Sequence, residues 1–389
     1  MNFSFYDPVR ILFGRGQLNN LHLQNFPGKK ALIVISAGKS IRQNGYLGRV
    51  EKQLDMAGIE HVIFDKILPN PILSHVTEGA KVARDNRCDF VIGLGGGSSI
   101  DSAKAIAVMA TNDGNFWDYV RAGSGKGKPV EKKPLPIIAI TTTAGTGTEA
   151  DPWMVITKED TDEKIGSGWD STFPYFSIVD PELMLTVPPA LTAYQGFDAL
   201  FHSTEGYINV TANVISDMFA MKSIELIGAN LAEAVANGND IDARENVALA
   251  NTLSGIVESL SGCTSEHSLE HALSAFHHNL PHGAGLIMIS KAYYTFFAKS
   301  GACDEKLIAM AKGLGKKDAK EPMDFVEALV DLQKKCGVDA LKMSDYGITK
   351  DELPEVVKNA RHTMGGLFNV DPAVLSDEDC LKIYEESYR

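Results

Sequence analysis

Continuous runs of apolar and β-branched residues, separated by helical stretches, characterise the first half of the chain. The runs lie at 31–35, 61–64, 89–93 and 135–140. Runs without polar alternation are typical of strands that are buried on both faces. Their alternation with helices predicts a mainly parallel, doubly wound (Rossmann-like) α/β sheet wrapped by helices.

The pattern changes at about Thr192, after which apolar positions recur with the 3.6-residue period of a helix. This periodicity covers 214–236, 243–260, 284–298 and 324–335, and no convincing strand interrupts it. Helices with one apolar face bury it against one another. The second half is therefore predicted to be an all-α helical bundle.

The boundary between these two halves is marked by prolines. Two prolines follow Val187 and end the last extended segment, and Thr192 with Gln195 forms a potential capping box for the next helix. A chain of 389 residues also exceeds the size of one ordinary domain. The sequence thus predicts an α/β domain at 1–187 and an all-helical domain at 188–389.

Charge and composition exclude several classes of partner. The chain has 37 Lys and Arg residues against 50 Asp and Glu residues, a net charge of −13, which disfavours nucleic acid and anionic membranes. No apolar run approaches the span of a bilayer, and the start lacks the blocks of a signal peptide. Five widely spaced cysteines without a paired motif fit a reducing compartment, so a cytoplasmic protein is expected.

Metal-ligand side chains recur at helical spacing in the second half. Asp198 and His202 stand four residues apart, as do His267 and His271, so each pair projects from one face of a helix. His282 lies between a proline and a glycine, where we expect a turn that closes over an ion. These donors predict one divalent metal ion held between the helices.

Two glycine-rich loops follow strands of the predicted sheet. The first, at 95–104, leads into a helix whose N–H groups would favour a pyrophosphate, with Asp101 capping or orienting the loop. The second, at 141–149, is rich in threonine and glycine and suits phosphate and ribose contacts at the carboxyl ends of the strands. The first loop lacks the G-x-G-x-x-G spacing, so it is either a dinucleotide site of another design or only a tight turn. Its candidate contacts are Gly96, Gly97, Ser98, Ser99 and Asp101.

The loop after the first predicted strand bears on the choice of dinucleotide. It carries Gly38, Lys39 and Ser40 but no acidic residue, whereas NAD sites usually place a carboxylate there on the ribose 2′-hydroxyl. Lys39 and the neighbouring serine hydroxyls would instead meet a 2′-phosphate. This favours NADP over NAD, although Lys39 could also be an ordinary solvated lysine.

Taken together, four motifs resemble the iron-containing (group III) alcohol dehydrogenase family over nearly the whole chain and in the family's order. They are Gly95–Ser98, Thr142–Gly147, Asp198-Ala-Leu-x-His202-x-x-Glu205, and His267-x-x-x-His271 followed by Pro281-His282-Gly283. The resemblance implies a dinucleotide-binding α/β domain, a helical metal-binding and substrate domain, and a cleft in which the metal faces the nicotinamide. By this resemblance Asp198, His202, His267 and His282 are metal ligands, and His271 lies next to them near the substrate. It also matches further positions to cofactor contacts, namely Asn70, Gly97, Ser98, Thr142, Thr146, Val155 and Lys164.

The expected activity is hydride transfer between NAD(P) and a small alcohol or aldehyde. The metal would act as a Lewis acid on the substrate oxygen, and His271 would carry a proton. The resemblance implies Fe(II) and a homodimer, while the ligand chemistry also permits Zn(II). One alternative is a lyase or cyclase of the same architecture, similar to dehydroquinate synthase, but the second half lacks clustered Lys and Arg beside the histidines. Another is a metal-binding assembly protein, which would have no need of two nucleotide loops.

Overall fold

The computed structural model describes residues 2–389, which form two compact units. One, the sheet unit, contains residues 7–143 and 148–186. The other, the helical unit, contains residues 2–6, the short segment 144–147 and residues 187–389. The second glycine-rich loop is therefore divided, with 144–147 packed in the helical unit.

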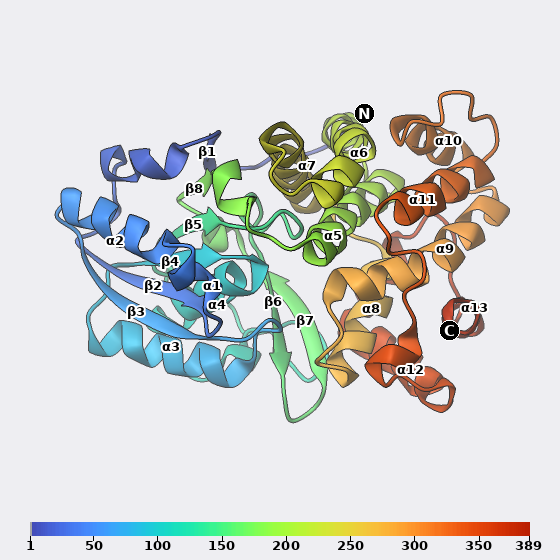
Figure 1. The fold of residues 1–389 in the computed structure, drawn as a ribbon. Coiled ribbons are helices and arrows are strands. Elements are labelled where there is room, and N and C mark those ends of the chain that lie inside the picture. The colour runs from blue at the N-terminus through green and yellow to red at the C-terminus, as the bar shows by residue number, and fades with distance from the viewer. Residues whose placement is uncertain (1) are drawn as a thin grey trace. The chain divides into compact units, whose positions relative to one another are not determined.

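The sheet unit is built on six parallel strands in the order β1-β8-β5-β4-β2-β3 (Figure 1). These strands are β1 (Arg10–Phe13), β2 (Lys30–Ser36), β3 (Glu60–Ile67), β4 (Phe90–Gly95), β5 (Ile137–Thr141) and β8 (Phe176–Val179). The chain passes from β2 outward to β3 and then returns to β4 on the other side of β2. Ligands of open α/β sheets bind at such a reversal, outside the carboxyl ends of the strands.

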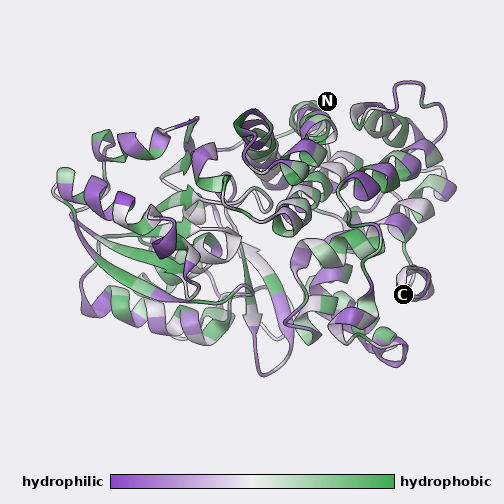
Figure 2. Cartoon of the chain, in the orientation of Figure 1, coloured by the Kyte–Doolittle hydropathy of each residue, from purple (hydrophilic) through white to green (hydrophobic). Residues whose placement is uncertain are grey.

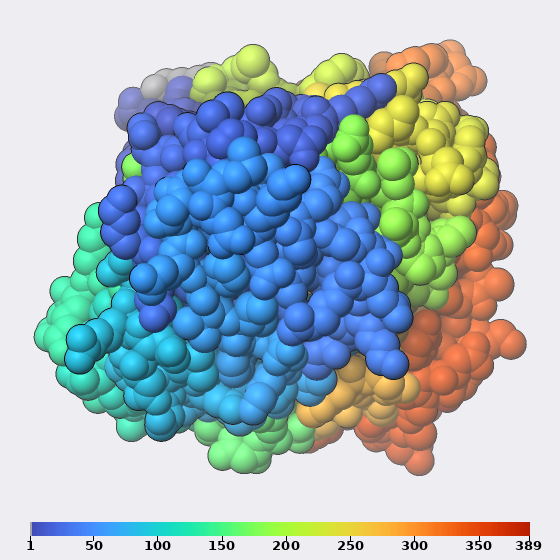
Figure 3. All heavy atoms as spheres, turned by 60° about the vertical axis from the view of Figure 1, so that its left-hand side comes forward, coloured from blue at the N-terminus to red at the C-terminus, as the bar shows by residue number. Residues whose placement is uncertain are grey.

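Helices cover both faces of this sheet, because the strands bury side chains on both sides. The helices of the unit are α1 (Ser40–Gln43), α2 (Tyr46–Met56), α3 (Leu73–Asp85) and α4 (Gly97–Thr111), with short 3₁₀ turns η1 (Gln17–Leu23), η2 (Phe116–Asp118), η3 (Asp170–Thr172) and η4 (Pro181–Met184). Leu32 and Val34 of β2 pack with α3 and α4, whereas Ile33 and Ile35 pack with α2 and η1. Much of the length of the central strands of this sheet is accordingly hydrophobic (green) in Figure 2. In Figure 3, segments from the first third of the chain cover the near face of this unit.

An antiparallel pair of strands, β6 (Trp153–Lys158) and β7 (Glu163–Gly168), also belongs to the sheet unit. The hydrophobic pattern of the sequence does not predict this pair. Its start is held by Lys104 of α4, a fully buried lysine that donates to the backbone carbonyl of Trp153 (2.7 Å) and pairs with Asp151 (3.0 Å). A buried ion pair with these additional bonds fixes β6 against α4.

The helical unit contains nine α-helices and three 3₁₀ turns among the described residues. They are α5 (Pro189–Ile208), α6 (Val214–Ala236), α7 (Ile241–Leu260), α8 (Ser265–Phe276), α9 (His282–Ser300), α10 (Asp304–Gly313), α11 (Met323–Lys335), α12 (Leu353–Met364) and α13 (Asp377–Ser387), with η5 (Met343–Tyr346), η6 (Lys350–Glu352) and η7 (Gly365–Val370). No helix within residues 2–389 combines the length and the apolar character needed to cross a bilayer. The predicted fold class, a parallel α/β sheet followed by an all-helical part, is confirmed.

The start of α5 differs from the prediction. The helix begins at Pro189, with Pro188 as its N-cap, so the predicted capping box of Thr192 and Gln195 is wrong. Proline suits the first helical position because its fixed φ is already helical and its missing N–H would have no partner there. Thr192 instead lies in the first turn and donates its hydroxyl to the carbonyl of Pro188 (3.1 Å).

Glycines let the helices of this unit approach closely. A Cβ at Gly283, near the start of α9, would lie 2.1 Å from the carbonyl oxygen of Tyr194 in α5. A Cβ at Gly255 in α7 would lie 2.1 Å from the carbonyl oxygen of Gly147. The first contact sets α9 directly against α5, and the second explains why the segment 144–147 packs with the helices.

Candidate metal centre

Three helices of the helical unit present acidic and imidazole side chains to one place. Helix α5 carries Asp198 and His202 one turn apart, α8 carries His267, and α9 begins at His282. The predicted turn at His282 is therefore wrong, because Pro281 is the N-cap and His282 is the first helical residue. The helix start, rather than a flexible turn, sets the direction of this imidazole.

The nitrogen atoms of two imidazoles converge on one carboxylate oxygen. Nε2 of His267 lies 3.5 Å from Oδ1 of Asp198, and Nε2 of His282 lies 3.4 Å from the same oxygen. Two ligand atoms at tetrahedral positions, each about 2.1 Å from an ion, are about 3.4 Å apart. The distances from Oδ1 of Asp198 to the two nitrogen atoms are therefore those of ligands around a common ion, and all three ligand atoms lie within 4.8 Å of one another.

Buried polar atoms without hydrogen bonds also indicate a metal site here. Oδ1 of Asp198, Nδ1 of His202 and Nε2 of His267 are buried, yet they make no hydrogen bond within residues 2–389. Burying a polar atom without a partner costs free energy, so such atoms are rare unless they have a further function. A divalent ion would satisfy them, and the residues present fit one.

Buried carboxylates hold the other nitrogen of two of the imidazoles. Glu205 of α5 accepts from Nδ1 of His267, and Glu270 of α8 accepts from Nδ1 of His282. Both glutamates are fully buried, and an ionised carboxylate can only accept. These bonds place the proton on Nδ1 and leave the Nε2 lone pair for a metal, as in carboxylate–histidine–metal triads.

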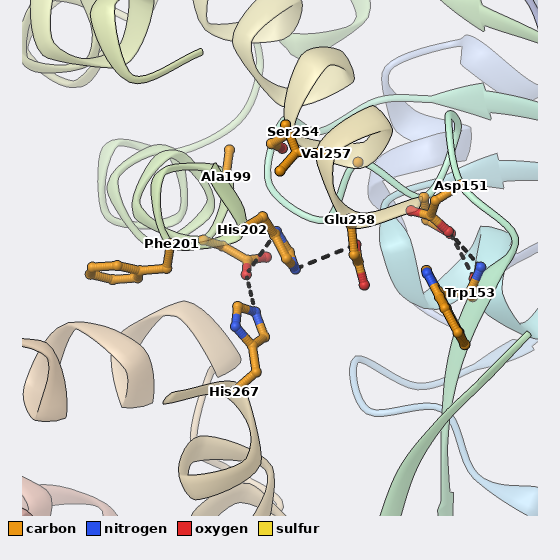
Figure 4. A network of polar contacts seen from close by, with 12 residues as sticks. Asp151, Trp153, Ala199, Phe201, His202, Ser254, Val257, Glu258 and His267 are labelled. Carbon is orange, nitrogen blue, oxygen red and sulfur yellow. Dashed lines mark hydrogen bonds and ion pairs between the residues drawn. The ribbon is translucent and has the colours of Figure 1, made fainter. Parts of the chain in front are cut away.

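His202 lies beside this group rather than within it. Its Nδ1 is 3.7 Å from Oδ1 of Asp198, and its ring stacks on that of His267 at 4.4 Å. The ligand atoms of Asp198, His267 and His282 all lie within 4.8 Å of one another, and His202 does not belong to that set. Its Nε2 instead faces Glu258 of α7 at 3.6 Å (Figure 4).

The charges of the site are set by burial and by these neighbours. Burial would raise the pKa of Asp198, but the imidazoles of His202 and His282 hold it well below its usual value. Burial lowers the pKa of His202 to about 3, so this imidazole stays neutral. Burial also disfavours charge on His267, but Cys263 and the Glu205 carboxylate raise its pKa well above the usual value. The site thus combines a carboxylate anion with a neutral imidazole at His202.

His271, the predicted catalytic residue, is buried in α8 next to the converging group. Its ring lies 5.1 Å from that of His282, and its Nδ1 lies 2.8 Å from the sulfur of Met364. A thioether can accept but cannot donate a hydrogen bond. This contact favours the tautomer with the proton on Nδ1, which leaves Nε2 as a proton acceptor.

Within the sheet unit, the predicted cofactor residues cluster at the carboxyl ends of neighbouring strands. Ser98, at the start of α4, donates its hydroxyl to the carbonyl of Pro69, next to Asn70. The amide of Thr142 donates to the carbonyl of Gly95 (2.9 Å), which joins the loop after β5 to the glycine loop. Gly95 has φ +147°, a conformation that only glycine adopts readily.

Other predicted cofactor residues have internal structural contacts. The two carboxylate oxygens of Asp101 accept from Thr148 (2.7 Å) and from the amide of Val155 (2.9 Å), so Asp101 ties α4 to β6. Lys164 is buried in β7, opposite Thr157. The remaining positions are the glycine-loop residues Gly96, Gly97 and Ser99 at the start of α4, the loop after β2 with Gly38, Lys39 and Ser40, and Thr146, which belongs to the helical unit.

No sequence motif indicates that Glu258 or Cys263 lies at this site. Glu258 is a single acidic residue near the end of α7, and Cys263 stands in the short loop before α8. Neither belongs to a spaced motif. Only the approach of α7 and this loop to His202 and His267 brings them near the site.

Comparison with known proteins decides the family. The iron-containing alcohol dehydrogenase family model matches residues 8–181, and the C-terminal model of the Fe-containing alcohol dehydrogenase family matches residues 192–388. This chain belongs to the iron-containing alcohol dehydrogenase family. It is therefore an NAD(P)-dependent oxidoreductase of alcohols and aldehydes, as predicted, and neither match supports the lyase alternative.

Full-length relatives agree with this assignment. Alcohol dehydrogenase 4 of Saccharomyces cerevisiae (strain YJM789) is 33% identical, with 99% of this chain and 98% of the relative covered. The NAD-dependent methanol dehydrogenase of Bacillus methanolicus is 34% identical, with 92% and 93% covered. The crystal structure of an archaeal halo-thermophilic alcohol dehydrogenase from a Red Sea brine pool, bound to NZQ, has a TM-score of 0.94 and 33% identity, with 100% and 99% covered.

Proposed function

We propose that this enzyme interconverts a small alcohol and its aldehyde with a divalent ion held by Asp198, His202, His267 and His282. The observation that carries the proposal is the pair of imidazoles whose Nε2 atoms converge on Oδ1 of Asp198 while buried glutamates hold their Nδ1 atoms. Such an arrangement is costly to fold unless a cation binds. His202 would complete the set from its position beside Asp198.

A divalent ion at this site would act as a Lewis acid on the substrate oxygen, and a bound nicotinamide would supply or accept the hydride. Asp198 would supply a negative charge that offsets the cation, and the buried carboxylates of Glu205 and Glu270 would add to this from behind His267 and His282. His271 would accept the hydroxyl proton on Nε2 during oxidation and return it during reduction. The contact with Met364 keeps its Nδ1 proton in place.

We propose Fe(II) as the native ion, on the basis of the family. One carboxylate and three imidazoles also suit Zn(II), and the affinity order of the metals favours zinc over iron. Reconstitution of metal-depleted protein with each ion in turn tests the choice between them.

We propose NADP as the preferred dinucleotide and the sheet unit as the part of the chain that binds it. We also propose that the boundary between the two domains lies at 187/188. The loop after β2 offers Lys39 and Ser40, which are exposed, and no carboxylate. It lies at the reversal of the strand order, beside the glycine loop after β4. The methanol dehydrogenase relative is NAD-dependent, so NADP is a property proposed for this chain and not for the family.

The proposed cofactor contacts divide by their surroundings. Gly96, Gly97, Ser98 and Ser99 would meet the pyrophosphate at the start of α4. Asp101 would position β6, since both its oxygens already accept hydrogen bonds within the protein. The proposal extends to Gly38, Asn70, Thr142, Thr146, Val155 and Lys164 as further contacts.

We also propose a homodimer. The edge strand β1 pairs on one side with β8, and no strand within residues 2–389 pairs with its other side. An unpaired edge is a common site of association. Light scattering coupled to gel filtration would give the mass in solution, and a mass of about one chain would contradict the proposal.

Metal-depleted protein, reconstituted separately with Fe(II) and Zn(II), tests the proposed activity. NADPH and NADH oxidation would be followed with a panel of small aldehydes. We expect activity only after a metal is restored, a higher kcat/KM with NADPH, and at least about a 100-fold loss in His282→Ala. Full activity in His282→Ala or in metal-free protein would refute the ligand assignment. Lys39→Ala should lower kcat/KM for NADPH and leave that for NADH unchanged.

A further inference from the structure

A second group of metal-ligand atoms lies next to the group at Asp198. The ligand atoms of His202, Cys263 and His267 all lie within 4.8 Å of one another, and all three residues are buried. Two imidazoles and one thiol are the donors that zinc and other soft metal ions prefer in proteins. This group shares His267 with Asp198 and His282 but contains neither of them.

The thiol of Cys263 is held in place by its backbone. The side chain of Asn209 donates to the carbonyl of Cys263 (3.2 Å), and the amide of Thr264 donates to Glu205 (2.8 Å). Gly262 provides the turn with φ +74°. Both bonds join this short loop to the end of α5, so the thiol has a fixed position relative to His202.

The two imidazoles have nitrogen atoms suited to a cation. Since Nδ1 of His267 is bound to Glu205, its Nε2 is the atom that can coordinate, and this atom makes no hydrogen bond with residues 2–389. His202 presents Nδ1 toward Asp198 and Nε2 toward Glu258 at 3.6 Å. The carboxylate of Glu258 adds negative charge on this side of His202, where Figure 4 shows it facing the ring.

We propose that His202, Cys263 and His267 form a thiolate-containing ligand set for soft divalent ions such as Zn(II) and Cd(II). Binding replaces the S–H bond by a sulfur–metal bond and releases one proton to solvent. Because Nε2 of His267 belongs to both sets, an ion bound through Cys263 competes with an ion bound through Asp198 and His282. The competition rests on the proposed function, whereas the soft-metal set itself does not.

Cadmium titration of metal-depleted protein tests the proposal directly, because a thiolate–Cd(II) bond produces an ultraviolet charge-transfer absorption. We expect the wild type to show this absorption and Cys263→Ser to lose it. Cys88→Ser is the matched control, since Cys88 is also buried but lies in the sheet unit, and it should keep the absorption. No absorption in the wild type, or an undiminished one in Cys263→Ser, would overturn the proposal.

His282→Ala separates this ligand set from the proposed function. We expect this variant to lose Fe(II)-dependent activity and to keep the Cd(II) absorption, because His282 belongs only to the first group. Loss of the absorption in His282→Ala would mean that the thiol binds the ion only together with Asp198, His267 and His282. That result would overturn the proposal of a distinct ligand set. Circular dichroism would check each fold. If Cys263→Ser does not fold, X-ray absorption of Zn(II)-loaded wild type decides, with one sulfur at about 2.3 Å expected and none contradicting the proposal.

Discussion

At the scale of single residues, Glu205 connects the metal centre to the rest of its unit. One of its oxygens accepts from Nδ1 of His267, and the other accepts from the amide (2.8 Å) and hydroxyl (3.2 Å) of Thr264. This carboxylate therefore fixes both the tautomer of a ligand and the loop before α8. Its role is to position His267.

Replacing Glu205 by glutamine tests this role. In Glu205→Gln one oxygen becomes an NH₂ group, which cannot accept a hydrogen bond from His267 or from Thr264. The imidazole of His267 is then held less firmly, so we expect metal affinity to fall by about 10- to 100-fold. The measurement is a competition titration of metal-depleted protein with a chromophoric chelator. Glu225→Gln, an exposed position on α6, should leave the affinity unchanged. Equal affinities in wild type and Glu205→Gln would contradict the role.

The buried carboxyl group of Asp371 should make the free energy of unfolding depend on pH. Burial raises its pKa to about 7, although hydrogen bonds from Ser265 and Tyr293 oppose the shift. The folded state therefore keeps a proton that the unfolded state loses near pH 4, so this stabilisation is present at low pH and is lost as the pH rises through 7. We expect Asp371→Asn to be more stable than the wild type at pH 8, by about 3 kcal/mol, with little difference at pH 4.

Urea unfolding of metal-depleted protein at pH 4, 6 and 8 would measure this difference. Asp331→Asn, an exposed position on α11, is the control and should follow the wild type at each pH. A wild-type unfolding midpoint that rises from pH 6 to pH 8 relative to that of Asp371→Asn would have the wrong sign and would exclude the explanation.

Residue spacing revealed part of the site but not all of it. Asp198, His267 and His282 could be recognised because helical spacing and a Pro-His-Gly motif are visible in the chain, and the structure brings them together. Glu258 and Cys263 could not be recognised, because their proximity to His202 depends on how α7 and the loop before α8 pack. Nothing in the local sequence encodes that packing.

At the scale of elements, the first turn of α9 can pack against Glu270 of α8 because Gly285 has no side chain. A Cβ at Gly285 would lie 2.7 Å from Cγ and Oε1 of Glu270, the residue that holds His282. Gly285→Ala should therefore displace Glu270 and lower metal affinity by about tenfold or more.

Gly366→Ala is the matched control, because nothing lies within 4 Å of its Cβ, and it should bind metal as the wild type does. Calorimetric titration would compare the two, and equal affinity in Gly285→Ala would show that Glu270 has room to move.

The elements differ in how well the sequence predicts them. The helix predicted at 214–236 has those bounds in α6, because Asn213 provides an N-cap and the apolar period is regular. The buried strands were also found, since continuous apolar runs are distinctive. The β6–β7 pair was missed because its short strands contain glycine and charged residues, and because β6 depends on Lys104 of α4 for its position.

At the scale of the whole molecule, the metal ion and the dinucleotide should stabilise different units. A ligand that binds the folded state at 100 times its Kd adds about 2.7 kcal/mol. Hydrogen exchange should therefore show that a restored metal ion slows exchange in α5, α8 and the start of α9. NADPH should instead slow exchange at the end of β4 and the start of α4.

His282→Ala is the control for this experiment. It should lose the protection that the metal provides and keep the protection that NADPH provides. Metal-dependent protection confined to the sheet unit would contradict the assignment of the ion to the helices.

The placement of residues 144–147 bears on any attempt to divide this protein. The amide of Gly147 donates to the side chain of Asn251 (2.9 Å), and its carbonyl rests against Gly255, where no side chain would fit. A C-terminal fragment that starts at Val187 would therefore lack four residues of its own interior, and it would expose an amide oxygen and a glycine notch on α7 to water. Such a fragment should fold better when residues 144–147 are supplied as a separate peptide, and a chimaera of two relatives should keep this segment together with the helical half.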